Sequence, residues 1–237
     1  MIYIKIIRYI INYFDFFQQK KIINFLSKRI SDQIIFFDIG SHHGETIFLF
    51  KKHFNIEQFH CFEPSFENFK KLKENIIRKK LNNLCILNNL AAGNENKKSF
   101  FYQIKESSSS TIQKINFNSK YLKRKLNFLN IGSMDEFYKT ETIQICRLDD
   151  YLCKNLIKQI TVLKIDTEGH EKKVLEGLND SIKKIKFIYF EHHYDDMIIK
   201  DYKFRDIHNY LSSFNFKQVY KSKMFFRKSF EYIYENQ

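Results

Sequence analysis

Acidic residues close several short apolar segments of this 237-residue chain. Asp38 is next to last in "IIFFDI", Asp166 ends "TVLKID", and Glu191 follows "IKFIYF". Continuous apolar runs of this length predict strands that a sheet buries on both faces. In an open parallel sheet, ligands bind beyond the carboxyl ends of the strands, near the point where the strand order reverses. We therefore expect these carboxylates to gather at one functional edge of a sheet.

The loop after the first of these segments has the pattern D-x-G-x-x-x-G, formed by Asp38, Gly40 and Gly44. A dinucleotide-binding loop needs G-x-G-x-x-G and a P-loop needs G-x-x-x-x-G-K-[ST], and neither is present. Glu63, at the end of the next apolar segment, can accept hydrogen bonds from both ribose hydroxyls of an adenosine. Asp38 and the loop favour a cationic or zwitterionic group over phosphates. S-adenosylmethionine has both features, and its carboxylate can use a helix N-terminus.

The side chains between the two glycines are bulky for a loop that contacts a ligand. Glycine lets the backbone approach the ligand, whereas the intervening side chains can point away from it. His42 and His43 are therefore permitted, and Ser41 is counted among the cofactor contacts. A metal ion bound by both histidines is the alternative, and it is disfavoured because neighbouring residues seldom face one ion together.

Methyl transfer from a sulfonium is an in-line displacement, so an enzyme must align the acceptor atom and manage its proton. A sugar or alkyl hydroxyl keeps its proton until late, which makes a positioned base or a divalent metal useful. Asp166, Glu191 and His192 are the predicted catalytic residues. His193 is a further candidate, and either histidine is equally consistent with an exposed loop. If a metal such as Mg²⁺ takes part, Asp166 and Glu191 are its predicted oxygen ligands.

Strands alternating with helices predict a doubly wound α/β sheet with helices on both faces. Residues 1–30 are predicted to form a helical segment that packs on or precedes one domain, residues 31–237. The alternation fails between about residues 94 and 142, which predicts an insertion and a candidate acceptor wall. "LCILNNLAAG" is predicted to be a single strand. Glu168 and Gly169 are expected to serve a tight turn into a helix.

The net charge of +13 raises the question of nucleic-acid or anionic-membrane binding. The excess is mainly lysine spread along the whole chain, which favours a solvated basic surface and a small-molecule or glycan acceptor. The one proline is Pro64, followed by Ser65, so the [DN]-P-P-[FYW] and Pro-Cys motifs of DNA methyltransferases are absent. RNA ribose methylation stays open as an alternative. The oligomeric state is not indicated.

The four cysteines form no CxxC pair, which favours a reducing, cytoplasmic compartment. The N-terminal run "MIYIKIIRYIINYFDFF" is apolar, but Lys5, Arg8 and Asp15 interrupt it and no small-residue cleavage site follows. An amphipathic helix that docks on the domain is expected. A helix lying on a membrane surface is the alternative.

The motifs "FFDIGSHHGETI", "FHCFEPSFENF", "LNNLAAGNEN", "CRLDDYL" and above all "VLKIDTEGHEKKVLEG" resemble those of the FkbM-type methyltransferases. The resemblance runs from about Phe36 to about His193, and the loop departs from the usual D-I-G-A-N-x-G at Ser41 and His42. It implies a Rossmann-like class I methyltransferase fold with a seven-stranded sheet and S-adenosylmethionine as cofactor. The implied cofactor contacts are Asp38, Gly40 and Gly44 at the methionine end, Glu63 at the ribose, and Asn89 to Ala91 at the adenine.

The resemblance also implies methylation of a hydroxyl on a sugar, a glycan precursor or another metabolite. The sequence does not name the acceptor. A non-catalytic binding or scaffold domain that has kept the fold is the alternative from a different class. Failure to bind the cofactor would favour that alternative.

Overall fold

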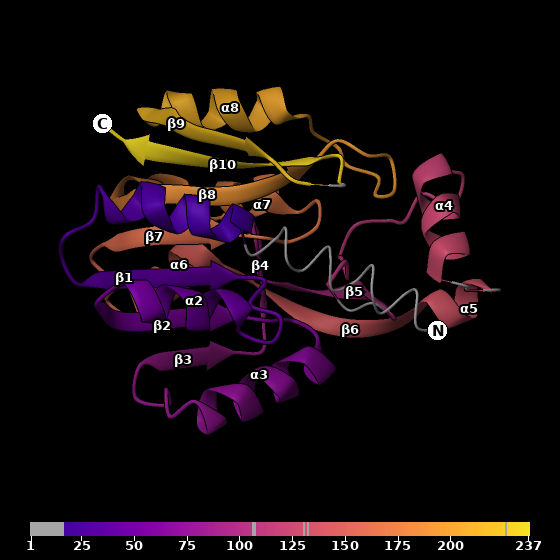
Figure 1. The fold of residues 1–237 in the computed structure, drawn as a ribbon, viewed down its shortest axis with the longest axis horizontal. Helices are drawn as coiled ribbons and strands as arrows, with labels where there is room; N and C mark the ends of the chain where they lie inside the picture. The colour runs from indigo at the N-terminus through magenta and orange to yellow at the C-terminus, as the bar shows by residue number, and fades with distance from the viewer. Residues whose placement is uncertain (1–16, 106–107, 130, 132, 226) are drawn as a thin grey trace.

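Seven strands form the central sheet of the computed structural model, which describes residues 17–105, 108–129, 131, 133–225 and 227–237 (Figure 1). Their spatial order is β3 (Cys85–Asn88), β2 (Ile56–Phe62), β1 (Ile34–Ile39), β7 (Ile160–Ile165), β8 (Ile185–His193), β10 (Ser229–Asn236) and β9 (Phe216–Lys223). Neighbouring strands are parallel except β10, which runs antiparallel to β8 and β9. The order reverses between β1 and β7, so the predicted doubly wound, mostly parallel sheet is confirmed.

Helices cover both faces of this sheet, as predicted. One face carries a helix at residues 17–27, α2 (Glu45–His53) and α3 (Phe66–Arg78), and the other carries α6 (Leu148–Lys154), α7 (Glu171–Glu176), η1 (Asn179–Lys184) and α8 (Phe204–Ser213). Phe36 of β1 packs with the first group of helices and Phe37 with the second. Side chains alternate across a strand, which is why a strand covered on both faces is apolar throughout.

The segment "LCILNNLAAG" is two strands in different sheets, so the prediction of one strand is wrong. β3 pairs with β2 at the edge of the main sheet, whereas β4 (Ala91–Gly93) pairs with β6 (Tyr138–Arg147). Asn89 lies between the two strands, and its side-chain amide donates to the carbonyl oxygens of Glu63, at 2.8 Å, and Pro64, at 3.1 Å. These hydrogen bonds hold the chain where it leaves the main sheet.

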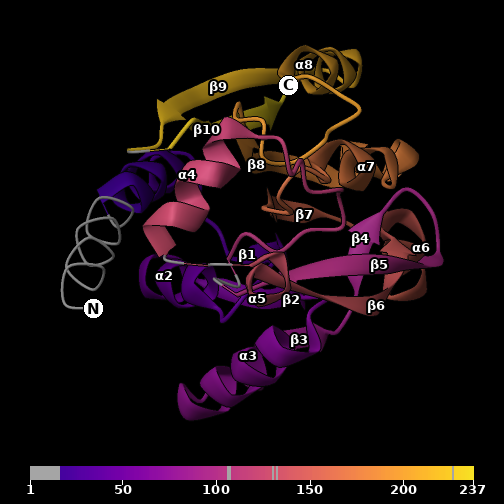
Figure 2. The ribbon, with the colours of Figure 1, turned by 90° about the vertical axis from the view of Figure 1, so that its right-hand side faces the viewer.

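Residues 94–142 build a second layer beside the main sheet. They contain β5 (Lys97–Ile104), α4 (Lys120–Leu129) and α5 (Met134–Phe137), and β4, β6 and β5 form a three-stranded sheet in that order. Ile115 forms a bridge with Ile198, in the segment that follows β8. Figure 2 shows α4 in front of the carboxyl ends of the main strands. This layer therefore stands over the edge where the sheet presents its polar residues.

The helix at residues 17–27 packs on the face that also carries α2 and α3. Ile22 and Leu26 are fully buried in the apolar cluster of that face. Gln19 Nε2 donates to the Tyr189 hydroxyl, at 3.0 Å, and to Oε1 of Glu231, at 3.1 Å. Residues 1–16 of the predicted N-terminal segment lie outside the described residues. Within the described ranges, no helix is both long enough and apolar enough to cross a membrane.

Candidate functional site

A buried lysine joins two of the predicted site carboxylates where the strand order reverses. Asp38 and Lys164 are register partners in β1 and β7, and Lys164 Nζ lies 3.2 Å from Asp38 Oδ1 and 3.4 Å from Asp166 Oδ2. Burial raises the pKa of Asp38, and Lys164 opposes that shift. Burial also lowers the pKa of Lys164, but the two carboxylates outweigh it and raise this pKa. Lys164 was not among the predicted site residues, although a lysine inside the apolar run "TVLKID" was the available signal.

Asp38 has one carboxylate oxygen that is buried without a hydrogen-bond donor among the described residues. Its side chain is fully buried, and among the described residues no hydrogen-bond donor reaches Oδ2. A buried acceptor without a donor is costly, so a ligand that brings a donor is favoured there. The ammonium group of a methionine moiety is such a donor, and Asp38 therefore fits the predicted cofactor.

Gly40 and Gly44 are required by the backbone of the loop. Gly40 has φ of +85°, and a Cβ there would lie 1.9 Å from the carbonyl oxygen of Asp166. The close approach that this glycine permits is thus between the ends of β1 and β7. Gly44 has φ of +94° and is the N-cap of α2. Ser41 is buried and its hydroxyl donates to the carbonyl oxygen of Asp38, at 2.8 Å, so its side chain holds the loop.

Glu63 lies buried beside the loop, at the end of β2. Its Oε2 accepts a hydrogen bond from the backbone N–H of His42, at 2.8 Å, and its Oε1 accepts one from Ser65, at 3.0 Å. Burial raises the pKa of Glu63 to about 7. The two backbone donors and the side chain of Asn68 hydrogen-bond to the carboxylate and orient it. A carboxylate has about four acceptor positions, so Glu63 can still accept from a ribose hydroxyl. The arrangement fits the predicted role.

The structure separates Asn89 and Ala91, which were predicted together at the adenine. Asn89 holds the segment around Glu63 through the hydrogen bonds described above. The side chain of Ala91 packs in the three-stranded sheet with Phe101, Ile143 and Ile145. We therefore withdraw Ala91 as a side-chain contact and keep Asn89 as a residue that positions the loop.

A second group of charged residues lies at the carboxyl end of β8. The His193 cluster consists of His193, Glu168, Glu191 and Asp195. His193 Nε2 lies 3.4 Å from Glu168 Oε2 and 3.4 Å from Glu191 Oε1, while Nδ1 lies 3.6 Å from Asp195 Oδ2. Burial lowers the pKa of His193, but Glu168 and Glu191 outweigh it and raise this pKa to about 10. Burial raises the pKa of Glu168 to about 7, and His193 opposes that shift.

His192 does not join the predicted catalytic residues. Its buried ring lies 4.8 Å from the ring centroid of Tyr194 and 5.8 Å from those of Tyr202 and Phe204. Burial lowers its pKa to about 4. Alternate residues of a strand face opposite sides, so Glu191 shares its face with His193 and not with His192. His193, and not His192, is thus the histidine that contacts Glu168 and Glu191, and the two-residue spacing from Glu191 was the signal for it.

Glu168 serves both the expected turn and the His193 cluster. Its φ is +51°, and Gly169 follows with φ of +96°. The buried carboxylate of Glu171 accepts hydrogen bonds from the backbone N–H of Gly169, at 2.9 Å, and Thr167, at 3.3 Å. Glu171 thus holds the turn, and the turn directs the Glu168 carboxylate toward His193. From the sequence, Glu168 was expected in the turn alone.

The predicted magnesium ligands do not form an oxygen site. Asp166 faces Lys164, and Glu191 faces His193. In the described part of the chain, the only three ionisable ligand atoms that lie within 4.8 Å of one another belong to His42, His43 and Glu45. Mg²⁺ prefers six oxygen ligands, so the surroundings of Asp166 and Glu191 do not fit it, and we assign no metal ion to these residues.

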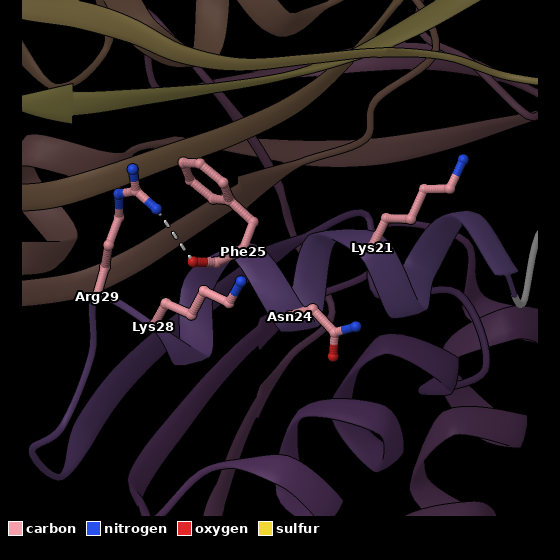
Figure 3. A pocket seen from close by; sticks show the side chains of 5 residues that line it. All are labelled: Lys21, Asn24, Phe25, Lys28 and Arg29. Carbon is pink, nitrogen blue, oxygen red and sulfur yellow. Dashed lines mark hydrogen bonds between the residues drawn. The ribbon is translucent and has the colours of Figure 1, made fainter.

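A surface depression lies along the helix at residues 17–27 (Figure 3). Lys21, Asn24, Phe25, Lys28 and Arg29 line it. The Arg29 guanidinium lies 3.9 Å from the centroid of the Phe25 ring and donates to the Phe25 carbonyl oxygen, at 3.5 Å. All five residues come from one helical segment, and the predicted cofactor and catalytic residues lie elsewhere. We therefore do not assign the depression to the chemistry.

The chain matches a known family over most of its length. The family model described as "Methyltransferase FkbM domain" matches residues 38–218. The solved FkbM methyltransferase of Methylobacillus flagellatus KT is 17% identical, with a TM-score of 0.57 over 86% of this chain and 44% of that chain. This chain thus spans less than half of that structure's length. An rRNA methylase structure from Streptococcus thermophilus is 10% identical, with a TM-score of 0.51 over 90% of this chain and 93% of that chain. Both likenesses show the fold alone, and no curated protein matches the chain.

Proposed function

Because this chain belongs to the FkbM family of S-adenosylmethionine-dependent methyltransferases, we propose that it methylates a hydroxyl oxygen of a sugar, glycan precursor or other metabolite. The proposal rests on two groups of buried charged residues at the carboxyl ends of the strands. Asp38 and Glu63 flank the loop after β1, and the His193 cluster lies at the end of β8. The first group suits a cofactor, and the second suits proton transfer from an acceptor.

The group at the loop would hold the cofactor through charge and hydrogen bonding. Oδ2 of Asp38 is the acceptor for the methionine ammonium, and the Glu63 carboxylate accepts from the ribose hydroxyls. Lys164 holds the Asp38 carboxylate through its other oxygen, Oδ1. When bound, S-adenosylmethionine supplies an electrophilic methyl group on a sulfonium. Gly40 and Ser41 shape the loop without touching the reacting atoms.

Glu168 is the proposed general base. A base works best when its pKa is near the working pH, and burial raises the pKa of Glu168 to about 7. His193 lies 3.4 Å away and stabilises the carboxylate once it is ionised. Glu191 and Asp195 hold His193 from two further directions. Asp166 stays in the proposal as a second carboxylate at the end of β7, paired with Lys164.

The layer over the carboxyl ends supports a polar acceptor. Thr111 Oγ1 donates to the carbonyl oxygen of Glu168, at 2.7 Å, and Lys125 Nζ donates to Ser109 Oγ, at 2.9 Å. Lys125 of α4 also acts electrostatically on Glu168. Hydroxyl and ammonium groups beside the proposed base suit a substrate with several hydroxyls. A base with a pKa near 7 favours such an acceptor over an amine, which needs little help with its proton.

Two alternatives remain distinguishable by experiment. RNA ribose methylation uses the same chemistry on a larger acceptor, and RNA is therefore included in the acceptor screen. A non-catalytic scaffold predicts no cofactor binding. The free cysteines Cys61, Cys85, Cys146 and Cys153 are consistent with the proposed cytoplasmic location.

Calorimetric titration with S-adenosylhomocysteine tests the proposal. We expect the wild-type protein to bind it and Glu63→Gln to bind at least about tenfold more weakly, which is about 1.4 kcal/mol. Glu67→Gln is the matched control, because Glu67 is exposed on α3 and forms a surface ion pair with Lys71, at 3.2 Å. A folded wild-type protein that does not bind would overturn the proposal and favour the scaffold.

A further inference from the structure

Three potential metal ligands converge at the start of α2. They are His42, His43 and Glu45, one ligand atom from each lying within 4.8 Å of the other two. Nδ1 of His42 lies 3.2 Å from Glu45 Oε1, and Nδ1 of His43 lies 3.7 Å from the same oxygen. The side chains are partly exposed, so an ion can reach them from solvent.

The backbone at His42 explains how neighbouring residues come to face one point. His42 has φ of +47°, in the left-handed region. The two imidazole rings consequently lie side by side, with centroids 3.7 Å apart and planes inclined by 24°. Adjacent side chains diverge in an extended chain, which is why the sequence disfavoured a shared ion. In this loop they turn to the same carboxylate.

The ligand spacing matches a tetrahedral metal site. Zn²⁺ binds histidine nitrogen and carboxylate oxygen at about 2.0–2.2 Å, which places two ligands at the tetrahedral angle about 3.4 Å apart. The two nitrogen-to-oxygen distances, 3.2 and 3.7 Å, bracket this value. Two histidines and one glutamate leave the fourth position open to water or a ligand.

Hydrogen bonds that orient the ligand side chains support the same assignment. Nε2 of His43 lies 3.3 Å from Oδ1 of Asn68, which is buried on α3. Donation from Nε2 leaves the Nδ1 lone pair directed at Glu45, and metal-binding histidines are commonly oriented in this way. The backbone N–H of His43 donates to Glu45 Oε2, at 3.2 Å, and so orients the carboxylate. Asn75 Nδ2 donates to the carbonyl oxygen of His43, at 2.9 Å, and holds the backbone.

We propose that His42, His43 and Glu45 bind a divalent transition-metal ion of the Zn²⁺ type. The ligand set of two nitrogens and one oxygen favours such an ion over Mg²⁺ or Ca²⁺, which prefer oxygen. The metal would anchor the loop rather than act on the methyl acceptor. Its ligands are separate from the His193 cluster.

Metal binding would also act on the residues expected to hold the cofactor. The backbone N–H of His42 donates to Glu63 Oε2, at 2.8 Å, so an ion on the His42 ring fixes a donor to the proposed ribose ligand. This coupling rests on the proposed function, whereas metal binding itself does not. An S-adenosylhomocysteine titration with and without Zn²⁺ tests the coupling separately.

Titration of the full chain with Zn²⁺, and with Co²⁺ followed by visible absorption, tests the site. We expect one ion per chain and the absorption of tetrahedral Co²⁺. His43→Gln and Glu45→Gln should each weaken binding by at least about tenfold. His53→Gln is the matched control, because His53 lies exposed in the last turn of the same helix.

Several outcomes would overturn the metal site. One is equal weakening by His53→Gln and His43→Gln, and another is undiminished binding by a His42→Gln/His43→Gln double variant. Absence of stoichiometric binding to the wild-type protein at micromolar Zn²⁺ would also overturn it. Thermal unfolding of each variant without metal confirms that the chain is folded. Zn²⁺ binding with no S-adenosylhomocysteine binding would instead support the metal site and reject the proposed function.

Discussion

Lys164 and Asp38 form a buried ion pair between the two central strands, with Nζ 3.2 Å from Oδ1. The pair lies where the strand order reverses, which is where ligands bind in this class of sheet. Asp166 shares the lysine from the end of β7. The charge around Asp38, where the cofactor is expected, therefore depends on an ion pair between β1 and β7.

Loss of Lys164 should destabilise the fold strongly. Lys164→Met leaves Asp38 and Asp166 without their shared cation, and removal of one partner of a buried pair costs about 3–5 kcal/mol. The loss should be smaller at pH 5 than at pH 8, because without Lys164 the Asp38 carboxyl becomes protonated more readily as the pH falls. Urea unfolding at both pH values measures this. Lys172→Met, which removes a partly exposed pair with Glu176, should cost less than about 1 kcal/mol. Equal losses for the two variants would contradict the prediction.

Alanine at the two loop glycines should have unequal effects. Both residues have positive φ, which costs a non-glycine residue about 1 kcal/mol or more. The Cβ of Gly40→Ala would also meet the backbone of Asp166 at 1.9 Å, whereas that of Gly44→Ala meets only side-chain atoms of Leu72 and Phe48, at 3.0 and 3.1 Å. Thermal unfolding should give Gly40→Ala a clearly lower melting temperature than Gly44→Ala. The reverse order would show that the end of β7 can move.

The affinity for S-adenosylhomocysteine should rise with pH through about 7. Glu63 has a raised pKa of about 7, so its carboxyl is protonated below that value and loses an acceptor for the ribose hydroxyls. At pH 6 about one molecule in ten carries the ionised form, which predicts roughly tenfold weaker binding than at pH 8. Calorimetry across this range should give a flat profile for Glu63→Gln. A flat wild-type profile would remove Glu63 from the ribose site.

Methyl transfer should depend on the ionisation of Glu168. With an acceptor from the screen, kcat/KM should increase with pH around a midpoint near 7, because the ionised carboxylate is the base. Glu168→Gln should lower kcat by about 10²- to 10⁴-fold. His193→Gln removes the group that stabilises the carboxylate, so the midpoint should move to higher pH. His192→Gln, on the other face of β8, should leave the midpoint unchanged. If kcat/KM had the same pH midpoint in His193→Gln and in His192→Gln, His193 would not be the group that stabilises the Glu168 carboxylate.

His192 and His193, at the end of β8, differ in the face of the strand on which they lie. The apolar segment before them predicted the strand correctly, whereas the site at its end stays a prediction. The alternation of side chains then assigns Glu191 and His193 to one face, and this inference was available without coordinates. Glu168 was harder to identify, because a turn of the chain decides where its carboxylate lies, and Glu171 fixes that turn through backbone hydrogen bonds.

The sequence by itself determined that strands alternate with helices in a mostly parallel sheet, that the central strands are buried on both faces, and that a loop with Gly40 and Gly44 follows the first of them. These properties follow from local periodicity and from the rule that parallel strands present their carboxyl ends at one edge. Only the tertiary structure decided that Lys164 pairs with Asp38, that Ala91 belongs to a second sheet and that His42 and His43 face one carboxylate. The register of the strands decides which distant residues become neighbours, as for Lys164 and Asp38. The backbone angles decide where adjacent side chains point, as for His42 and His43. Neither property can be read from local periodicity.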